Sequence, residues 1–564
     1  MTEKSTQNAQ SWLSDAYDSS TRIAVQNLIN TKGEDLIESF YKDLDFGTGG
    51  MRGIMGVGSN RINKYTIGKA TQGLANTLIE MYPNDDISVA IAYDCRNNSD
   101  FLAQVSADVL SANGIKVFLF SALRPTPELS FAVRELSCKS GIVITASHNP
   151  KEYNGFKVYG NDGCQIVNPF DVELIKKVRA LSIEDVNFNK QEDLISTLGE
   201  EFDTLYINRI KTLSLSPNAI KEYNNLPIVF TGIHGTGAVM VPKTLKAFGF
   251  TNVLTVTSQD IIDGNFPTVK SPNPEEPAAL ELAISLAKEK GAKLVMGTDP
   301  DADRVGIAIP DKSGEFILLN GNQTGSLLIN YLVTRWKELG KISGKEFIAK
   351  TVVTTDLMDK IALNNGVKVY NTLTGFKHIG AVIRALEGKE QFIGGGEESY
   401  GYLAGDFVRD KDAVMSCVLI AEMVAWALSN GKDLFDLMQE MYLEHGFYLE
   451  DLISITKQGR HGAAEIKAIM DNLRKNTPNS IVGEKVVKFI DYLETDKTNL
   501  PQSNVLQFIT DKGTKVTARP SGTEPKIKFY FSVQDHLKSN SDFYKVQDKL
   551  QRKIIEIQNE MSLI

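Results

Sequence analysis

Four polar motifs along the chain combine residue types that could transfer a phosphoryl group. The first contains Ser147, which follows the apolar run 141–144 in the segment Thr-Ala-Ser-His-Asn-Pro. That run predicts a buried strand, so Ser147 would lie at the carboxyl end of a strand, where ligands of open α/β sheets bind. A phosphoserine monoester hydrolyses slowly, which suits storage of a phosphoryl group between turnovers. A serine hydrolase, the alternative, would need an orienting acid or a G-x-S-x-G turn, and this segment offers neither.

The second motif has carboxylates at alternate positions, Asp299, Asp301 and Asp303, followed by Arg304. In an extended backbone alternate side chains share one face, so the three carboxylates could converge on a hard cation such as Mg²⁺. An EF-hand loop is excluded, because arginine and Pro310 stand where that loop needs glycine and a bidentate glutamate. A solvated acidic turn is the alternative. The preceding apolar run favours the metal site, and Arg304 could add a phosphate clamp.

Candidate proton-transfer groups lie in two further segments. Lys157 closes the segment Tyr-Asn-Gly-Phe-Lys, and Lys377 and His378 close the segment Thr-Gly-Phe-Lys-His. A lysine can act as a general base where burial or nearby cations lower its pKa. A solvated surface charge is the more common state of a single lysine.

The last two motifs have the composition of ligand-binding loops. In the segment Gly-Glu-Glu-Ser-Tyr-Gly, Glu397 and Ser399 alternate, and a carboxylate with a hydroxyl suits sugar hydroxyls. The loop from Arg519 to Lys526 offers a guanidinium, hydroxyls and a glycine amide for a phosphate. Besides Arg519, the phosphate-binding candidates are Ser521, Gly522 and Thr523. Plain turns are the alternative for both loops. The sequence contains no Walker motif, which argues against a nucleoside triphosphate kinase.

Bulk composition indicates an ordinary globular protein of several domains. The chain has 564 residues, of which 42% are hydrophobic and 23% charged, and its net charge is −9. This charge provides no global attraction for nucleic acid or an anionic membrane. The four cysteines have no metal or disulfide spacing, the amino terminus is polar, and no apolar stretch approaches the ~20 residues of a membrane span. We therefore expect a cytoplasmic protein.

Strand-like apolar runs alternate with amphipathic stretches over most of the chain, which predicts parallel or mixed sheets covered by helices. The first ~40 residues predict helices only. Each of the first two motifs and the sugar loop follows a strand-like run, which indicates a repeated α/β unit. Short strands and a final helix near 542–561 predict an α+β unit at the carboxyl end. We expect domains at 1–212 with the serine loop, 213–318 with the metal loop, 319–445 with the sugar loop and 446–564 with the phosphate loop.

These motifs, in this order, resemble the α-D-phosphohexomutase superfamily. The likeness also includes the segment Phe-Gly-Thr-Gly-Gly-Met-Arg-Gly at 46–53, and it runs over nearly the whole chain. It is strongest to the phosphoglucomutase branch, which includes bacterial phosphoglucomutases and related phosphopentomutases. The resemblance implies four domains around a central cleft: three related α/β domains with mixed sheets and a C-terminal α+β domain, each contributing one loop.

The resemblance also implies roles for the residues of each motif. Ser147 would be the phosphoserine, and its phosphate would hold Mg²⁺ together with Asp299, Asp301 and Asp303. Proton transfer and contact with the reacting phosphate would involve His148, Lys157, Lys377, Arg52 and Arg304. The sugar and the non-reacting phosphate would contact Glu397, Ser399, Arg409, Lys411, Arg519, Ser521, Gly522 and Thr523.

The implied reaction converts glucose 1-phosphate into glucose 6-phosphate through glucose 1,6-bisphosphate, which also primes the enzyme. Its partners would be small sugar phosphates, and the protein a monomer or homodimer. The Gly-Glu-Glu-Ser-Tyr-Gly loop favours glucose over mannose or glucosamine esters. A phosphopentomutase and a glucose 1,6-bisphosphate synthase remain alternatives. A catalytically silent sugar-phosphate-binding relative is disfavoured, because binding alone does not require Ser147.

Overall fold

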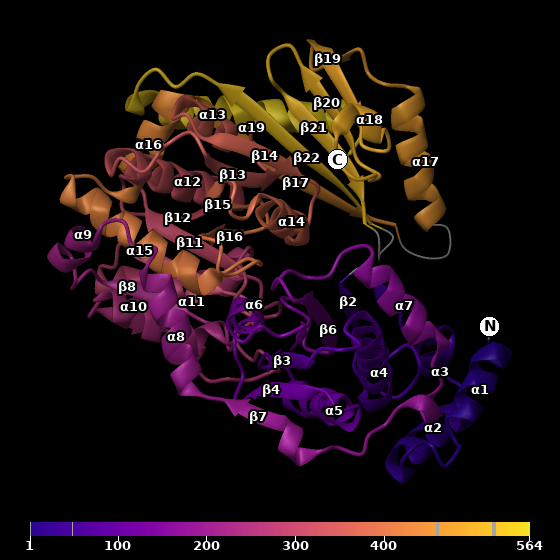
Figure 1. Ribbon diagram of the computed structural model, residues 1–564. Helices are drawn as coiled ribbons and strands as arrows, with labels where there is room; N and C mark the ends of the chain where they lie inside the picture. Colours follow the sequence, from indigo (N-terminus) through magenta and orange to yellow (C-terminus); the bar gives the residue numbers. More distant parts are fainter. Residues whose placement is uncertain (1, 48, 458–461, 522–525, 564) are drawn as a thin grey trace.

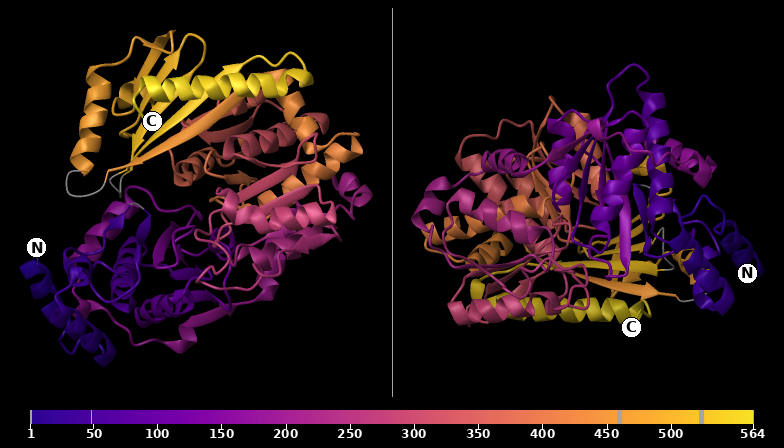
Figure 2. Two further views of the ribbon diagram at one scale, coloured as in Figure 1. Left: turned by 180° about the vertical axis from the view of Figure 1, so that it is seen from behind. Right: turned by 90° about the horizontal axis from the view of Figure 1, so that it is seen from below.

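The computed structural model describes residues 2–47, 49–457, 462–521 and 526–563. Four β-sheets follow one another along the chain, each with its own helices. Figure 1 shows that the four sheet-containing units form an arc, with the first and the last unit at its two ends. The view from behind in Figure 2 shows these two end units facing each other. The α/β fold class with a C-terminal α+β unit is thus confirmed, whereas the central cleft stays a prediction.

The first sheet has seven strands in the order β1-β2-β6-β5-β3-β4-β7. They are β1 (Phe46–Gly47), β2 (Gly50–Ile54), β3 (Ser88–Tyr93), β4 (Lys116–Phe120), β5 (Ser140–Ile144), β6 (Tyr153–Gly160) and β7 (Ile195–Leu198). Its helices are α4 (Lys64–Met81), α5 (Ser99–Ala112), α6 (Thr126–Glu135), α7 (Phe170–Ala180) and α8 (Glu200–Lys211). The strands β3, β4, β5 and β7 are parallel, and β6 pairs antiparallel with β5.

The second and third sheets have five and four strands. The second, in the order β12-β11-β10-β8-β9, contains β8 (Ile228–Thr231), β9 (Val253–Thr255), β10 (Leu294–Thr298), β11 (Val305–Pro310) and β12 (Phe316–Leu319). The third, in the order β14-β13-β15-β16, contains β13 (Glu346–Thr351), β14 (Lys368–Thr372), β15 (Gln391–Glu397) and β16 (Gly401–Ala404). Their helices are α9 (Pro217–Glu222), α10 (Gly237–Phe248), α11 (Pro277–Lys290), α12 (Gly321–Glu338), α13 (Leu357–Asn364), α14 (Phe376–Leu386), α15 (Ala413–Ser429) and α16 (Leu434–His445).

One four-strand arrangement recurs in all three sheets. The strands run β4-β3-β5-β6 in the first sheet, β9-β8-β10-β11 in the second and β14-β13-β15-β16 in the third. In each case the first three strands are parallel and the fourth is antiparallel. The structure therefore contains the repeated α/β unit that the sequence indicated.

The last sheet is antiparallel throughout, in the order β17-β22-β21-β20-β19-β18. Its strands are β17 (Phe447–Thr456), β18 (Ser480–Ile481), β19 (Glu484–Asp491), β20 (Leu506–Thr510), β21 (Lys515–Pro520) and β22 (Lys526–Asp535), and its helices are α17 (Gly462–Lys475), α18 (Thr495–Thr498) and α19 (Phe543–Glu560). The proposed domain boundaries stay a proposal. The boundary after residue 318 divides β12, whose last residue Leu319 still pairs with Ile307 of the second sheet.

Side chains of the first sheet alternate between two hydrophobic clusters. Val89 and Ile91 of β3 pack with residues of α4, α5 and α7, whereas Ala90 and Ala92 belong to a cluster that continues through the other three units. This alternation follows from the two-residue period of a strand. The larger cluster joins the units into one body, which lets loops from different sheets meet at fixed distances.

The amino-terminal segment forms the expected helices, α1 (Thr2–Ser11), α2 (Ser19–Thr31) and α3 (Glu34–Phe40). Aromatic contacts attach them to α4: Trp12 stacks on Tyr17 with ring centroids 4.5 Å apart, and both rings contact Tyr65 edge-on. The Tyr65 hydroxyl donates a hydrogen bond to Asp18 at 2.7 Å. Such aromatic pairs add about 0.5–1.5 kcal/mol each beyond burial of their area.

In the described part of the chain, no single helix is long and apolar enough to cross a membrane. The helices α15 and α16 reach that length and composition only as a pair, which is bent by 86°. The four cysteines, Cys95, Cys138, Cys164 and Cys417, are free thiols.

A partly buried carboxyl group on β17 makes stability depend on pH. Burial raises the pKa of Glu450 to about 7, although bonds from Thr355 and Ser532 and the nearby Lys515 oppose the shift. A carboxyl whose pKa is raised by folding contributes stability that is fully present below its unfolded pKa, near 4.5. This stability is lost as the pH rises through the folded pKa of about 7. We expect Glu450→Gln to remove about 3 kcal/mol of this pH dependence. Urea unfolding at pH 5 and pH 8 measures the effect.

The matched control is Glu556→Gln, which replaces an exposed glutamate of α19 in the same unit. It should retain the full difference in unfolding free energy between the two pH values. The same pH dependence in Glu450→Gln and the native chain would contradict the assignment.

Candidate active site

Three predicted loops occupy the same place in the repeated unit. The loop with Ser147 joins β5 to β6, the loop with the aspartates joins β10 to β11, and the loop with Ser399 joins β15 to β16. Each loop therefore leaves the carboxyl end of a central parallel strand, where α/β sheets bind ligands. The structure brings the first two together and places residues of the third unit against them.

Ser147 is buried, with 4% of its surface exposed, and its backbone is left-handed with φ = 52°. Its Oγ donates to Asp299 Oδ2 at 2.8 Å and lies 3.1 Å from His148 Nδ1. Its N–H donates to Thr145 Oγ1 at 2.9 Å. Left-handed backbone costs a non-glycine residue roughly 1–2 kcal/mol, so the surrounding bonds must hold this conformation. The hydroxyl thus points from the first unit at the carboxylates of the second.

The three aspartates converge as the alternation predicted. Each offers a carboxylate oxygen within 4.8 Å of the others, and all three residues are buried. Among the described residues, Asp301 Oδ1 and Asp303 Oδ1 have no hydrogen-bond partner. Buried carboxylate oxygens without partners are costly, whereas Mg²⁺ prefers such ligands. The donor set therefore fits a hard divalent cation.

Burial and neighbouring charges move the pKa values of Asp299 and Asp301 in opposite directions. Burial, followed by the charges of Asp301 and Asp303, raises the pKa of Asp299 well above its ordinary value. Burial acts in the same sense on Asp301, but the Lys157 ammonium outweighs it and lowers the pKa of that carboxyl. Lys157 Nζ lies 2.7 Å from Asp301 Oδ2 and 3.5 Å from Asp303 Oδ2. The Lys157 ammonium thus lies within ion-pair distance of two of the three carboxylates.

Neighbouring units clamp the aspartate loop on both sides. From the first unit, Thr126 donates its hydroxyl to Asp301 Oδ2 at 2.8 Å and its N–H to the Asp301 carbonyl at 2.9 Å. From the third unit, the N–H of Ala413, the first residue of α15, donates to the Ala302 carbonyl at 3.1 Å. Lys411 Nζ lies 3.0 Å from Asp303 Oδ2. The loop geometry therefore requires all three units.

The arginines predicted at the reacting end differ in their surroundings. Arg52 of β2 is exposed and donates to Asn149 Oδ1 at 2.9 Å, beside the serine loop. Arg304 is paired with Glu275, with Nη1 and Oε1 2.5 Å apart, and this carboxylate contributes to a raised pKa of the arginine against the effect of burial. A phosphate at Arg304 would meet this glutamate.

The predicted residues of the third unit lie in α14 and at the β15–β16 turn. Glu397 is buried and accepts from the Gly375 N–H at 2.8 Å, at the start of α14. Lys377 makes no ion pair with any described residue, and burial lowers its pKa. Burial, then the charges of Lys377 and Arg519, lowers the pKa of His378 to about 4. Ser399 lies in the β15–β16 turn and is partly exposed.

The phosphate loop begins at the end of β21. Arg519 Nη1 lies 3.5 Å from the Tyr530 hydroxyl, and the Ser521 N–H donates to the Lys526 carbonyl at 2.7 Å. The predicted residues Gly522 and Thr523 lie outside the described residues. The charge of Arg519, at the end of β21, contributes to the lowered pKa of His378 in α14.

Arg409 is not part of the cluster. It is buried, its Nε donates to the Asp406 carbonyl at 2.9 Å, and its Nη2 lies 2.9 Å from Glu387 at the end of α14. The adjacent Lys411 points instead to Asp303. The two cations of the predicted stretch therefore have different partners, and of the two only Lys411 contacts an aspartate of the cluster.

Several residues of the site were missed by the sequence analysis. Thr126 binds Asp301, Glu275 pairs with Arg304, and Lys528 is the cross-strand partner of Arg519. Arg96 binds the backbone of the serine loop. The signal for Arg96 was available, because an Asp-Cys-Arg segment directly follows the apolar run of β3.

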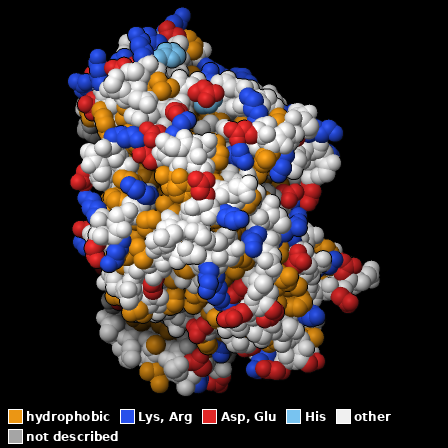
Figure 3. All heavy atoms as spheres, turned by 90° about the vertical axis from the view of Figure 1, so that its left-hand side faces the viewer, with side chains coloured by type: hydrophobic (Ala, Val, Ile, Leu, Met, Phe, Trp, Pro, Cys, Tyr) orange, Lys and Arg blue, Asp and Glu red, His pale blue; other side chains and the backbone are white. Residues whose placement is uncertain are grey.

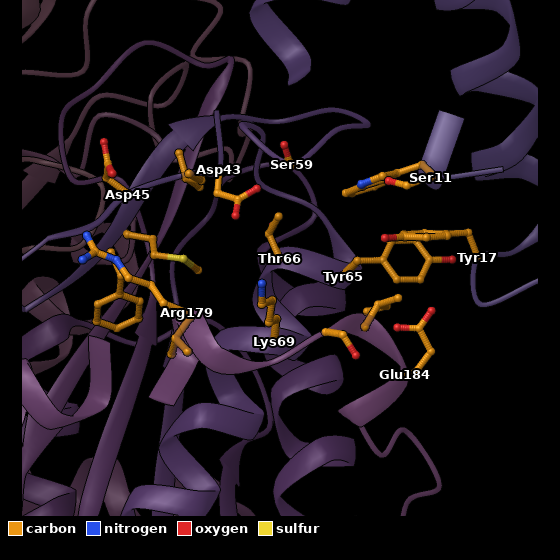
Figure 4. A pocket seen from close by; sticks show the side chains of 17 residues that line it. Ser11, Tyr17, Asp43, Asp45, Ser59, Tyr65, Thr66, Lys69, Arg179 and Glu184 are labelled. Atoms are coloured by element: carbon orange, nitrogen blue, oxygen red, sulfur yellow. The ribbon is translucent and has the colours of Figure 1, made fainter. Parts of the chain in front are cut away.

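The cavity in Figure 4 lies between the amino-terminal helices and the first sheet, and neither Ser147 nor the three aspartates line it. Its volume is about 470 Å³, and its lining includes Trp12 and Tyr65. Three carboxylates (Asp43, Asp45, Glu184) and two cations (Lys69, Arg179) line it, so charges of both signs face the cavity. On the face drawn in Figure 3, acidic and basic side chains are likewise interspersed.

Comparison with family models gives three matches along the chain. The models are described as alpha/beta/alpha domains I, II and III of phosphoglucomutase/phosphomannomutase, and they match residues 43–183, 204–314 and 320–445. Together they cover more than half of the chain, and each contains one of the three equivalent loops.

Similar proteins extend the match to most of the chain. A phosphoglucomutase of Staphylococcus haemolyticus (strain JCSC1435) is 39% identical over 536 residues, 90% of this chain and 96% of the relative. One of Staphylococcus aureus (strain bovine RF122 / ET3-1) is 38% identical over 548 residues, 94% and 96% of the two chains. The open form of parafusin, a phosphoglucomutase from Paramecium, has the same fold, with a TM-score of 0.69 at 17% identity over 92% of this chain and 96% of the other.

The fold, with a serine hydroxyl bonded to one of three convergent carboxylates, defines the phosphohexomutase class of intramolecular phosphotransferases. The chain belongs to the phosphoglucomutase/phosphomannomutase family.

Proposed function

We propose that this chain is a phosphoglucomutase, which interconverts glucose 1-phosphate and glucose 6-phosphate through a phosphoserine at position 147. The observation that carries the proposal is the 2.8 Å contact between Ser147 Oγ and Asp299, beside two further convergent aspartates. The curated relatives named phosphoglucomutase, at 38–39% identity, support the choice of hexose.

The proposed reaction has two phosphoryl transfers. In the first, the bond between phosphorus and Ser147 Oγ breaks, and phosphorus bonds to O6 of glucose 1-phosphate. The O6 proton passes to a base, and glucose 1,6-bisphosphate results. After the bisphosphate turns over, the bond between phosphorus and O1 breaks, the phosphoryl group returns to Ser147, and O1 regains a proton. Glucose 6-phosphate leaves, so atoms and charge balance over the cycle.

Proton transfer has two candidate positions. His148 Nδ1 lies 3.1 Å from Ser147 Oγ, so the ring could hold a proton at the serine oxygen. Lys377 has a lowered pKa and no ion-pair partner among the described residues, so it could accept the proton of a sugar hydroxyl. Lys157 is bound to Asp301 and is better placed to hold the loops together.

Binding of the sugar phosphate would use both ends of the site. We assign Arg52, Arg304 and Lys411 to the transferred phosphoryl group, and Glu397 and Ser399 to the sugar hydroxyls. Arg519 and Ser521, with Gly522 and Thr523, would hold the other phosphate. Asp299, Asp301, Asp303 and the phosphate on Ser147 would hold Mg²⁺, which would neutralise charge on the transferred group.

A coupled assay tests the proposal. Conversion of glucose 1-phosphate is followed with Mg²⁺ and catalytic glucose 1,6-bisphosphate, with ribose 1-phosphate and mannose 1-phosphate in parallel. Bisphosphate-stimulated turnover of glucose 1-phosphate supports the proposal. Turnover of the ribose ester alone would identify a phosphopentomutase, and of the mannose ester alone a phosphomannomutase. Formation of the bisphosphate from another phosphoryl donor, without mutase turnover, would identify a synthase. Monomeric or dimeric state and a cytoplasmic location stay predictions.

Replacing the cation of the phosphate loop should weaken binding more than chemistry. Arg519→Ala removes a charged hydrogen-bond donor, and such bonds contribute about 1.5–3 kcal/mol. We expect KM to rise by roughly 10–100-fold and kcat to change little. Steady-state kinetics measure both parameters.

Lys512→Ala, which removes an exposed lysine near the other end of the β20–β21 hairpin, is the control and should leave KM unchanged. If Arg519→Ala lowers only the rate of the phosphoryl transfer step in single-turnover experiments, the phosphate-binding role is disproved.

A further inference from the structure

We infer that Arg96 positions Ser147 for phosphoryl transfer and connects the serine loop to the unit that carries the aspartates. The inference rests on the proposed phosphoserine chemistry and adds a residue to it. Arg96 directly follows the Asp94-Cys95 pair after β3. It lies 51 to 57 residues before the residues whose backbone carbonyls it binds. Its side chain is fully buried.

The guanidinium binds four carbonyl groups of the serine loop. Its Nη2 donates to the carbonyls of Ser147 at 2.6 Å and Asn149 at 2.5 Å. Its Nη1 donates to those of Pro150 at 2.9 Å and Tyr153 at 3.0 Å. A guanidinium presents its donors in a rigid fork, which a lysine ammonium cannot reproduce. One side chain therefore fixes the loop from Ser147 to the start of β6.

Asp94 completes the support from the other side of Ser147. Its Oδ2 accepts from Thr145 Oγ1 at 2.7 Å, and Thr145 Oγ1 in turn accepts from the Ser147 N–H at 2.9 Å. Asp94 Oδ2 also lies 3.3 Å from Arg96 Nε, and both side chains are completely buried. The peptide groups before and after Ser147 are thus bonded, directly or through Thr145, to one buried ion pair.

This support bears on catalysis because of the Ser147 conformation. A serine at φ = 52° would lower its energy by relaxing, and relaxation would move Oγ away from Asp299. A misplacement of about 1 Å can lower a rate by roughly 100-fold. The hydrogen bonds of Arg96 oppose that movement.

A ring from the second unit covers the same guanidinium. Phe266, in the segment between β9 and α11, has its centroid 5.2 Å from the Arg96 guanidinium carbon. Nearby, Gly264 packs so closely that an added Cβ would lie 2.5 Å from the Asn97 backbone nitrogen. The second unit, which carries the aspartates, therefore contacts Arg96, whose hydrogen bonds fix the serine loop. Arg96 thus links the positions of the serine loop and the aspartate loop.

The test compares Arg96→Lys with a matched control, Arg124→Lys. Arg124 is also a buried arginine of the first unit, paired with Asp203 at 2.6 Å and not bonded to the serine loop. Full-length protein with Mg²⁺ is assayed for kcat, KM and Tm. After phosphorylation by glucose 1,6-bisphosphate, the ³¹P resonance of phosphoserine is recorded.

We expect Arg96→Lys to lower kcat about 100-fold with KM within a few-fold of the native value, and to shift the ³¹P resonance. Arg124→Lys should lower Tm comparably but keep kcat and the resonance. A native kcat and resonance in Arg96→Lys, with a lowered Tm, would show a structural role only and overturn the inference.

Two further comparisons keep the outcome decisive. If Arg96→Lys does not fold, Phe266→Leu removes the ring over the guanidinium but leaves its four hydrogen bonds in place. A several-fold lower kcat at constant KM supports the link between the loops, and a native kcat overturns it. If the native chain turns over no sugar phosphate, the proposed function fails. The rate at which bisphosphate phosphorylates Ser147 then tests Arg96 separately.

Discussion

Replacing Ser147 with alanine should lower kcat by a factor on the order of 10⁴ or more, because loss of a covalent nucleophile removes the reaction path itself. The fold should persist, since the hydroxyl donates one bond to Asp299 and the backbone bonds of residue 147 remain. The measurement is the coupled assay, together with incorporation of labelled phosphate from glucose 1,6-bisphosphate. Both turnover and labelling should disappear.

Ser121→Ala, which changes an exposed serine of the same unit, is the control and should behave as the native chain. Substantial turnover in Ser147→Ala would refute the phosphoserine assignment. Loss of turnover with labelling preserved would place the phosphoryl group on another residue.

Asp301→Asn should lower kcat by roughly 10³-fold or more and abolish the response to Mg²⁺. The asparagine has the same shape and can still accept from Thr126, but it removes a charge beside two other aspartates. Metal stabilisation of a phosphoryl group contributes several kcal/mol, which corresponds to this factor. Magnesium titrations of activity after chelation measure the loss, and calorimetry measures binding directly.

Glu281→Gln, an exposed position on α11 of the same unit, controls for a general charge effect and should keep the native magnesium response. An unchanged magnesium titration in Asp301→Asn would show that Asp301 is not a ligand.

Local patterns predicted much of the fold. The apolar runs near 87–92, 115–120 and 228–231 form β3, β4 and β8, because a mainly apolar run suits a strand of a parallel sheet that helices cover. The antiparallel strands β6, β11 and β16, which follow the serine, aspartate and sugar loops, were not predicted, and neither was β17, whereas β21 and β22 beside Arg519 were. Gly401–Ala404 is a short strand that forms through pairing with Glu397 and its neighbours, a contact that periodicity cannot reveal.

The candidate site was predictable where chemistry is local in the sequence. The aspartates alternate, and the strand before them fixes their place, so their convergence followed from spacing. Contacts between distant segments carried no such signal: Thr126 is 175 positions from Asp301. Arg409 and Lys411 alternate along the chain, yet one binds Glu387 and the other Asp303, because the segment is buried between two partners.

The clamp on the aspartate loop has a consequence for synthesis of the protein. Thr126 precedes the loop in the chain, whereas Tyr400 and Ala413, which bind the backbone beside and within it, follow by about a hundred residues. A growing chain that has released only the first two units from the ribosome still lacks the bonds from Tyr400 and Ala413. The catalytic centre therefore matures late, after the third unit has been made and has docked. A nascent chain can be largely folded and still unable to react.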